Sequence, residues 1–137
     1  MGLTSASTGS TLLNSNFFIL KESKDFTVTL AGNPNVGKST IFNGLTGMNQ
    51  HTGNWTGKTV SNATGNCTYL DKNFLLVDIP GTYSLISHSK EEEVATEFIS
   101  SNISDVTVVV VDATCLERNL NLVYQIMNIT NNVIICV

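Results

Sequence analysis

Apolar residues cluster along this chain in short runs that are rich in β-branched side chains. The runs that predict strands are FTVTLA at 26–31, VSNATGNCTYL at 60–70, NFLLVDI at 73–79, DVTVVVVDA at 105–113 and VIICV at 133–137. A turn at Asp71–Asn73 joins the second run to the third. The last two runs are almost continuously apolar, which is typical of strands buried on both faces of a sheet.

Between these runs, apolar residues recur at helical spacing. The helix expected at 38–47 presents Ile41, Phe42 and Leu45 and stops at Gly47. Ser89 and Glu92 fit a capping box that opens the next helix. The apolar stripes expected for the two later helices are Val94, Ala95, Phe98 and Ile99, and then Leu116, Leu120, Val123 and Met127. Strands that alternate with helices predict a three-layer α/β fold with a mostly parallel sheet.

Composition is that of one globular domain, with 42% hydrophobic and 13% charged residues in a chain of 137. The net charge of −4 gives no basic surface for nucleic acid. No apolar run has the length of a membrane span. Residues 1–25 are rich in Ser, Thr and Asn and predict a flexible N-terminal extension, which leaves residues 26–137 as the folded domain.

The segment GNPNVGKS at 32–39 matches the Gly-x4-Gly-Lys-Ser/Thr pattern of phosphate-binding loops. It follows an expected strand and opens an expected helix. Gly32 and Gly37 let backbone N–H groups turn toward phosphate oxygens, and the helix N-terminus adds its positive end. We expect Lys38 to bridge the β- and γ-phosphates and the Ser39 hydroxyl to bind magnesium. The sequence therefore predicts a nucleotide site of the P-loop NTPase type.

A second phosphate motif is DIPG at 78–81. In P-loop proteins an aspartate at the end of a buried strand lies on the magnesium side, and the following glycine presents an N–H to the γ-phosphate. Thr59, between the two motifs, is expected to bind magnesium only while a γ-phosphate is present. The alternative for Asp78 is a turn residue that ends a strand.

Four segments together resemble the N-terminal G domain of bacterial ferrous iron transport protein B, within the TrmE–Era-like P-loop GTPases. They are GNPNVGKSTIFNGLTG, GNWTGKTV, DIPGTYSL and VVVVDATCLERNLNL, and the resemblance covers residues 26–137. The first and third occur in GTPases generally, whereas the tryptophan-containing loop and DATCLERNLNL are narrower and carry the identification.

The resemblance implies a GTP-binding and GTP-hydrolysing regulatory domain of a ferrous iron transporter, at the cytoplasmic face of the bacterial inner membrane. GTP or GDP, Mg²⁺ and K⁺ are its expected ligands. Its expected partners are the membrane-spanning remainder of the transporter and a second copy of the chain, with no nucleic acid.

The resemblance also implies a set of site residues. Those expected to contact the nucleotide are Gly32, Asn33, Pro34, Asn35, Val36, Gly37, Lys38, Ser39, Thr40, Gly57, Lys58, Thr59, Val60, Ser61, Asp78, Ile79, Pro80 and Gly81. Those expected to act in catalysis are Asn35, Lys38, Thr59 and Gly81. Ser39, Thr59 and Asp78 are the expected magnesium ligands.

Trp55, the only tryptophan, lies in a polar loop at 51–60 that the resemblance identifies as switch I. In the family, backbone carbonyls here, those of Gly53 and Trp55, help hold a potassium ion against the nucleotide. Asn35 supplies a side-chain ligand to the same ion. That ion does electrostatically what an arginine finger does elsewhere, which is worth about 10³- to 10⁵-fold in rate. The alternative is that Trp55 packs on the domain surface or on a partner subunit.

Two positions depart from related patterns. Thr56 follows the tryptophan where the family often has proline, so we expect a more mobile loop. Thr82 follows DIPG where Ras-like enzymes have the glutamine that orients water. We therefore expect slow intrinsic hydrolysis, with water held by backbone groups and the potassium site.

By the resemblance, guanine is read by an Asn-x-x-Asp motif after the strand at 133–137, and the sequence ends at Val137 before it. We therefore expect a G domain that is incomplete at its C-terminus, binds GTP weakly and discriminates poorly against ATP. The strand at 133–137 should lie at a sheet edge.

Two other functions fit the motifs. One is a soluble GTPase of ribosome or tRNA assembly, against which the acidic net charge argues. The other is a module that binds nucleotide without useful turnover. Two residues also have open roles: His88 as a general base or an exposed loop residue, and Asp112 near the nucleotide side of the sheet or as a helix cap.

Overall fold

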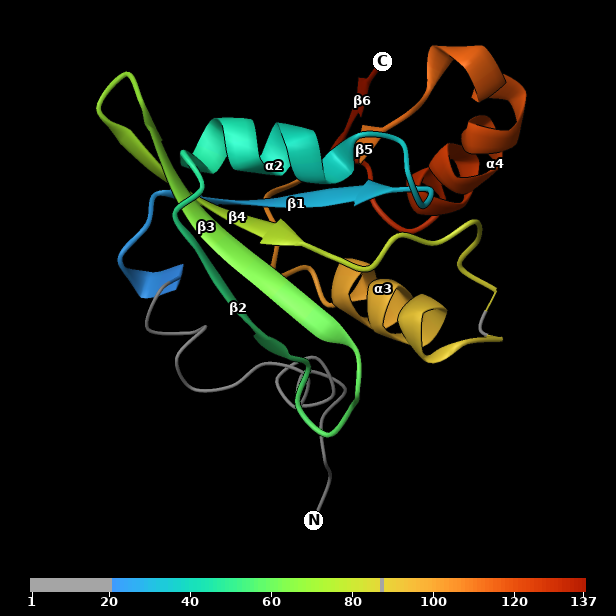
Figure 1. Cartoon of the computed structure of the whole chain (residues 1–137), viewed down its shortest axis with the longest axis horizontal. Coiled ribbons are helices and arrows are strands. Elements are labelled where there is room, and N and C mark those ends of the chain that lie inside the picture. Colours follow the sequence, from blue (N-terminus) through green and yellow to red (C-terminus); the bar gives the residue numbers. More distant parts are fainter. Residues whose placement is uncertain (1–20, 87) are drawn as a thin grey trace.

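The computed structural model describes residues 21–86 and 88–137. Its strands form one sheet in the order β2-β3-β4-β1-β5-β6 (Figure 1). The strands are β1 Phe26–Gly32, β2 Gln50–Asn54, β3 Ser61–Tyr69, β4 Lys72–Asp78, β5 Val106–Val110 and β6 Val133–Cys136. The helices are α2 Lys38–Thr46, the 3₁₀ turn η3 Ala113–Cys115, α3 Lys90–Ser100 and α4 Leu116–Met127.

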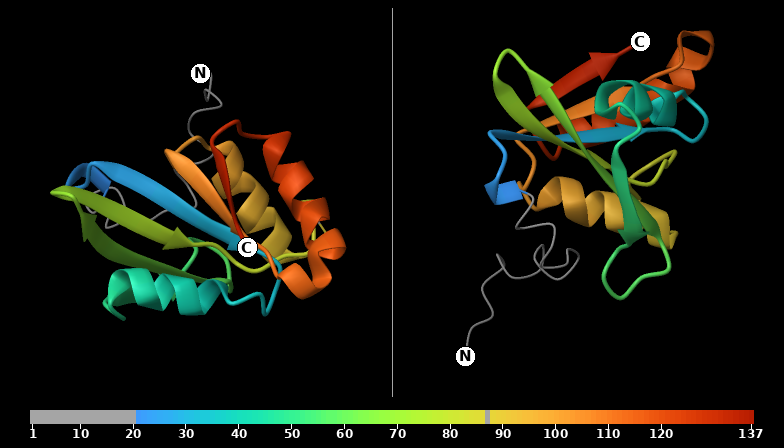
Figure 2. Two further views of the ribbon diagram at one scale, coloured as in Figure 1. Left: turned by 90° about the horizontal axis from the view of Figure 1, so that it is seen from above. Right: turned by 60° about the vertical axis from the view of Figure 1, so that its left-hand side comes forward.

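Helix α2 covers one face of the sheet, and α3 and α4 cover the other (Figures 1 and 2). The predicted three-layer α/β fold is therefore confirmed. Strand β1 lies between β4 and β5 and runs parallel to both, and β6 runs parallel to β5. Strands β2, β3 and β4 form an antiparallel meander. The parallel part of the sheet is thus the part that connects to all three helices.

Each face of the sheet has its own apolar core. The smaller core, under α2, is formed by Leu30, Phe42 and Leu76. The larger one lies under α3 and α4 and includes Val77, Val94, Phe98, Val109, Leu122 and Ile126. The alternation of side chains along β1 supplies both, because Leu30 points to the first and Ala31 to the second.

The edge strand β2, Gln50–Asn54, contains the first four residues of the loop predicted at 51–60. It pairs antiparallel with β3, and all of its side chains are exposed. An edge strand that is exposed on both faces is held by backbone hydrogen bonds, so it needs no apolar alternation. The sequence pattern therefore carried no signal for it.

The predicted apolar stripe of α4 is correct for Val123 and Leu120, which belong to or pack against the larger core, but wrong at its two ends. Leu116 and Met127 are 39% and 51% exposed, whereas the buried residues are Asn119, Leu122, Val123 and Ile126. Asn119 turns inward because its amide is fully used there: its Oδ1 accepts from the N–H of Asp112 at 3.1 Å and its Nδ2 donates to the Cys115 carbonyl at 2.8 Å. A polar residue with two such bonds can occupy a core position.

Strand β6 lies at a sheet edge as expected, but it is not buried on both faces. Ile134 and Ile135, on opposite faces, are 54% and 45% exposed. Residues 1–20 of the predicted extension lie outside the described residues. Within residues 21–25, the Lys21 ammonium donates to the Ile103 carbonyl at 2.7 Å and the Asp25 N–H to Asn73 O at 2.9 Å. None of the described helices is long and apolar enough to cross a bilayer.

Two helix starts agree with the sequence analysis. Ser89 and Glu92 form the predicted capping box of α3. His88 is exposed, and its backbone N–H donates to Glu92 Oε2 at 2.9 Å. Asp112 caps η3, and its carboxylate accepts from Thr114 Oγ1 at 2.6 Å and from Thr114 N at 2.8 Å.

The cap at Asp112 predicts a dependence of stability on pH. Hydrogen bonds, first that from the Thr114 hydroxyl, hold the pKa of the Asp112 carboxyl below its ordinary value. A carboxyl whose pKa is lower in the folded state than in the unfolded state stabilises the folded state at pH values above its unfolded-state pKa. That stabilisation is lost as the pH falls through the folded-state pKa. We expect Thr114→Val to raise the Asp112 pKa in an NMR titration, and Thr68→Val on β3 to leave it unchanged. An unchanged pKa in Thr114→Val would contradict the assignment.

Candidate functional site

The loop between β1 and α2 starts at a position where only glycine fits. Gly32 ends β1 and pairs with Val110 of β5. A Cβ at Gly32 would lie 2.8 Å from the Val110 carbonyl oxygen, a backbone atom that cannot easily move. The close packing of β1 on β5 therefore requires this glycine, and it fixes where the loop leaves the sheet.

The loop backbone is left-handed at two positions. Asn35 and Gly37 adopt left-handed conformations with φ of 63° and 91°. Gly37 is also the N-cap of α2, and no side chain caps that end. Successive residues of mixed handedness make a concave arrangement of N–H groups that favours anions, and the helix N-terminus adds a positive potential.

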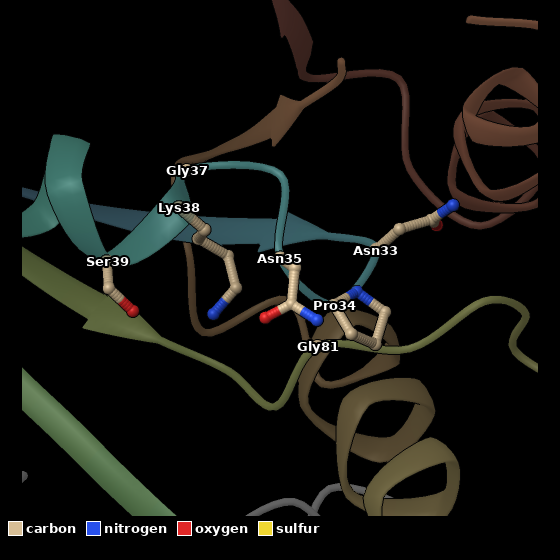
Figure 3. A pocket seen from close by; sticks show the side chains of 7 residues that line it. All are labelled: Asn33, Pro34, Asn35, Gly37, Lys38, Ser39 and Gly81. Atoms are coloured by element: carbon tan, nitrogen blue, oxygen red, sulfur yellow. The ribbon is translucent and has the colours of Figure 1, made fainter. Parts of the chain in front are cut away.

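A pocket lies in this loop and is lined by Asn33, Pro34, Asn35, Gly37, Lys38, Ser39 and Gly81. The side chains of Asn35, Lys38 and Ser39 point to the same side of the loop, and that of Asn33 points away (Figure 3). The structure thus brings together six of the eight residues of the first motif, without Gly32 and Val36, and Gly81 of the second.

Lys38 and Asp78 form an ion pair at the floor of this site. The parallel pairing of Leu30 with Asp78 brings the end of β4 beside the end of β1 and the start of α2. The Lys38 ammonium contacts Asp78 Oδ1 and donates to the Ile79 carbonyl at 2.7 Å. Their side chains are only 10% and 19% exposed, so solvent screens the pair weakly.

The segment after β4 crosses directly under the loop. The Thr82 N–H donates to the Gly32 carbonyl at 3.1 Å. A Cβ at Gly81 would lie 3.2 Å from Pro34 Cα, which leaves little room for a larger residue. Thr82 is 5% exposed, so its hydroxyl does not line the open side of the pocket in this conformation.

Residues 82–86 contact both α3 and α4. The sequence analysis did not predict these contacts. Leu85 N donates to Gln125 Oε1 of α4 at 2.5 Å, and Leu85 O accepts from Thr96 Oγ1 of α3 at 3.1 Å. The Arg118 guanidinium lies 4.7 Å from the centre of the Tyr83 ring. Leu85 and Gln125 are 40 positions apart and Leu85 and Thr96 are 11 apart, so the pattern of neighbouring residues does not predict these contacts.

The predicted residues of the 51–60 loop lie outside the pocket in this conformation. Gly53 belongs to β2, and Thr59 is exposed. Trp55 is 1% exposed, and its carbonyl accepts from Lys58 N at 2.9 Å. Of the residues expected to bind magnesium or potassium, Ser39 and Asn35 line the pocket, whereas Asp78 is paired with Lys38 and the residues of the 51–60 loop lie elsewhere.

Trp55 packs neither on the domain surface nor on a partner subunit, which were the two packing alternatives in the sequence analysis. The indole lies in the larger core of its own domain. Its ring is 5.2 Å from that of Phe98 on α3, at an interplanar angle of 60°. A core position explains why a polar loop contains a large aromatic residue.

Asn33 is a site residue with an unusual environment. It is 2% exposed, and neither of its amide atoms has a hydrogen-bond partner in the part of the chain that the structure describes. Buried amides are normally paired, so a residue of this kind marks a place where a partner is supplied by water or by another conformation.

The glycine-containing loop connects a central parallel strand, β1, to a helix, and its lysine contacts the aspartate that ends the neighbouring strand β4. These features define a P-loop α/β protein. The family described as ferrous iron transport protein B matches residues 26–137. The chain belongs to this family.

Relatives and solved structures agree with this assignment. The chain is 50% identical over 104 residues to the Fe(2+) transporter FeoB of Methanocaldococcus jannaschii and 46% identical over 110 residues to that of Escherichia coli. These alignments cover 76% and 77% of the chain but only 16% and 14% of the two relatives.

Among solved structures, the G domain of the T. maritima FeoB iron transporter superposes with a TM-score of 0.78 at 39% identity. That match covers 80% of this chain and 69% of the other. A GDP-bound A143S variant of the S. thermophilus FeoB G domain gives a TM-score of 0.70 at 44% identity, covering 74% of this chain and 39% of that one.

The Lys38–Asp78 pair predicts a measurable coupling. Removing one partner leaves the other charge poorly solvated, whereas removing both does not. We expect a double-mutant cycle of Lys38→Met and Asp78→Asn to give a coupling energy of about 1–3 kcal/mol in urea unfolding. Additive effects of the two substitutions would show that the pair contributes nothing. The same cycle on the exposed pair Lys72 and Asp71 is the control, with an expected coupling near zero.

Proposed function

We propose that this chain is a guanine-nucleotide-binding and GTP-hydrolysing domain of a ferrous iron transporter. The observation that carries the proposal is the loop at 32–39, where left-handed residues Asn35 and Gly37, the N-terminus of α2 and the Lys38 side chain border one pocket. This combination suits a chain of phosphates. The name of the S. thermophilus G domain, which describes it as GDP-bound, supports guanine nucleotide as the ligand.

Lys38 has to change partners when it binds nucleotide. Its ammonium now contacts Asp78 and the Ile79 carbonyl, which together compensate its charge in a nearly buried site. Phosphate oxygens would replace these acceptors, and the Asp78 carboxylate would then be available on the same side as Ser39. A hydroxyl and a carboxylate are the hard oxygen ligands that Mg²⁺ prefers, so these residues fit that ion.

Hydrolysis would rely on the backbone more than on side chains. Gly81 lines the pocket, and its N–H is the proposed contact to the γ-phosphate. Thr82 is buried, so a role in orienting water through its hydroxyl needs a different conformation. Asn35 points into the pocket and fits an amide-oxygen ligand for potassium (Figure 3). The carbonyls of Gly53 and Trp55 join that set only after the 51–60 loop has moved.

In the whole transporter, nucleotide-dependent changes in residues 51–60 and 81–90 would gate a membrane pathway for ferrous iron from its cytoplasmic side. The chain spans about a sixth of the length of the curated relatives it matches. The membrane-spanning remainder is accordingly its proposed partner, and self-association is proposed for the assembled transporter. A nucleotide-binding module without turnover is the second candidate, because the arrangement of the 51–60 loop leaves Thr59 outside the pocket.

Nucleotide binding should depend on Lys38. We expect Lys38→Ala to weaken the affinity for GDP and for a non-hydrolysable GTP analogue by about 100-fold, because it removes a charge-assisted contact to phosphate. Isothermal titration calorimetry measures both affinities. Lys72→Ala, at an exposed position at the start of β4, is the matched control and should bind as the natural chain does. Unchanged affinity in Lys38→Ala would overturn the proposed function.

Potassium should accelerate hydrolysis through Asn35. We expect phosphate release from GTP to be slow in sodium chloride and at least about tenfold faster in potassium chloride, with the difference lost in Asn35→Ala. Asn66→Ala, an exposed asparagine on β3, controls for the substitution itself. Stimulation that survives in Asn35→Ala would remove this residue from the ion site. Nucleotide binding without phosphate release in either salt would favour the second candidate function.

A further inference from the structure

The turn formed by residues 55–60, here called the Trp55 turn, is packed against helix α3. Trp55 is 1% exposed and makes an edge-to-face contact with Phe98 of α3. Val60, at the other end of the turn, is 6% exposed and belongs to the same core. Both ends of the turn are therefore anchored in the domain interior, and the edge-to-face pair adds to the burial of apolar area.

Lys58 adds an electrostatic contact between the same turn and the same helix. Its ammonium lies 3.0 Å from Glu93 Oε2 and 3.7 Å from Glu97 Oε2. The two glutamates are four residues apart, so they share one face of α3. The Lys58 side chain is 17% exposed, whereas those of Glu93 and Glu97 are 49% and 40% exposed, so solvent screens these contacts and each contributes modestly.

Thr59 cannot leave this position alone. The turn is closed by hydrogen bonds from Trp55 N to Val60 O and from Lys58 N to Trp55 O, each at 2.9 Å. Thr59 lies inside this closed turn, directly after Lys58, and its side chain is exposed. Ala63 of β3 pairs with Asp78, and Thr59 lies four residues before Ala63, outside β3, in the turn that packs on α3.

We propose that Lys58, Glu93 and Glu97, together with Trp55, form a latch that sets the preference of the domain between nucleoside diphosphate and nucleoside triphosphate. The proposal rests on the proposed function, in which Thr59 reaches the phosphate site only with a triphosphate. For that movement the Trp55 turn must leave α3, and the latch contacts must break. A diphosphate bound by the 32–39 loop makes no such demand, so the latch lowers triphosphate affinity selectively.

The single tryptophan of the chain is a built-in reporter of the latch. With no nucleotide and with GDP, we expect Trp55 emission typical of a buried indole and little quenching by iodide. Adding Mg²⁺ and a non-hydrolysable GTP analogue should shift the emission to longer wavelength and increase the quenching. Emission that stays at the buried position when the analogue is bound, as measured by calorimetry, would overturn the proposal.

Two independent variants test the ion pair. Lys58→Met and the double variant Glu93→Gln/Glu97→Gln should each raise the ratio of triphosphate to diphosphate affinity by about threefold to tenfold, because each removes a contact that only the triphosphate form must break. Circular dichroism checks that each variant is folded, and the double variant decides the test if Lys58→Met is not.

Matched controls separate the latch from general charge effects. Glu91→Gln removes an acidic residue from the same first turn of α3, and Lys72→Met removes an exposed lysine; both should leave the ratio unchanged. An unchanged ratio in both latch variants, with GDP affinity intact, would overturn the latch and leave the proposed function standing. Retention of nucleotide affinity in Lys38→Ala would instead overturn the proposed function.

Discussion

The parallel pairing of β1 with both β4 and β5 is the constraint on which the rest of the structure depends. It places the ends of three strands at one edge, so the loop after β1 and Asp78 at the end of β4 meet there. Gly32 allows β1 to approach the Val110 carbonyl as closely as it does. Lys38 then reaches Asp78 across that edge, although the two are far apart in sequence. The candidate site is therefore a property of the sheet as much as of the loop motif.

Acceptors of the domain itself already compensate the charge of Lys38 in the candidate site. The Lys38 ammonium is nearly buried, and a buried charge without a partner is strongly unfavourable. Asp78 and the Ile79 carbonyl compensate it inside the domain. In the proposed function, phosphate oxygens would compete with these acceptors, so the affinity for an anion would be the difference between two states in which the ammonium charge is compensated.

The features predicted from sequence are those that local physics determines. The β-branched run at 26–31, the glycine pattern at 32–39 and the capping box at Ser89 each depend on neighbouring residues, and each was found where expected. The core faces of α3 also agree with their helical spacing. These signals suffice to place the loop, its lysine and the aspartate of the next strand.

What the sequence did not predict depends on long-range contacts. Strand β2 is held by its backbone pairing with β3 and has no apolar alternation. The phase of α4 follows from Asn119, whose inward position is explained only by the two backbone groups it meets. The interior position of Trp55 depends on Phe98, which lies in α3, more than 30 residues further along the sequence. A window of neighbouring residues contains none of this information.

Leu85 connects the segment after β4 to both α3 and α4. Its N–H is held by α4 through Gln125 and its carbonyl by α3 through Thr96, so a single peptide segment is tethered in two directions. A displacement of Leu85 therefore has to break one of these hydrogen bonds or move α3 or α4 with it.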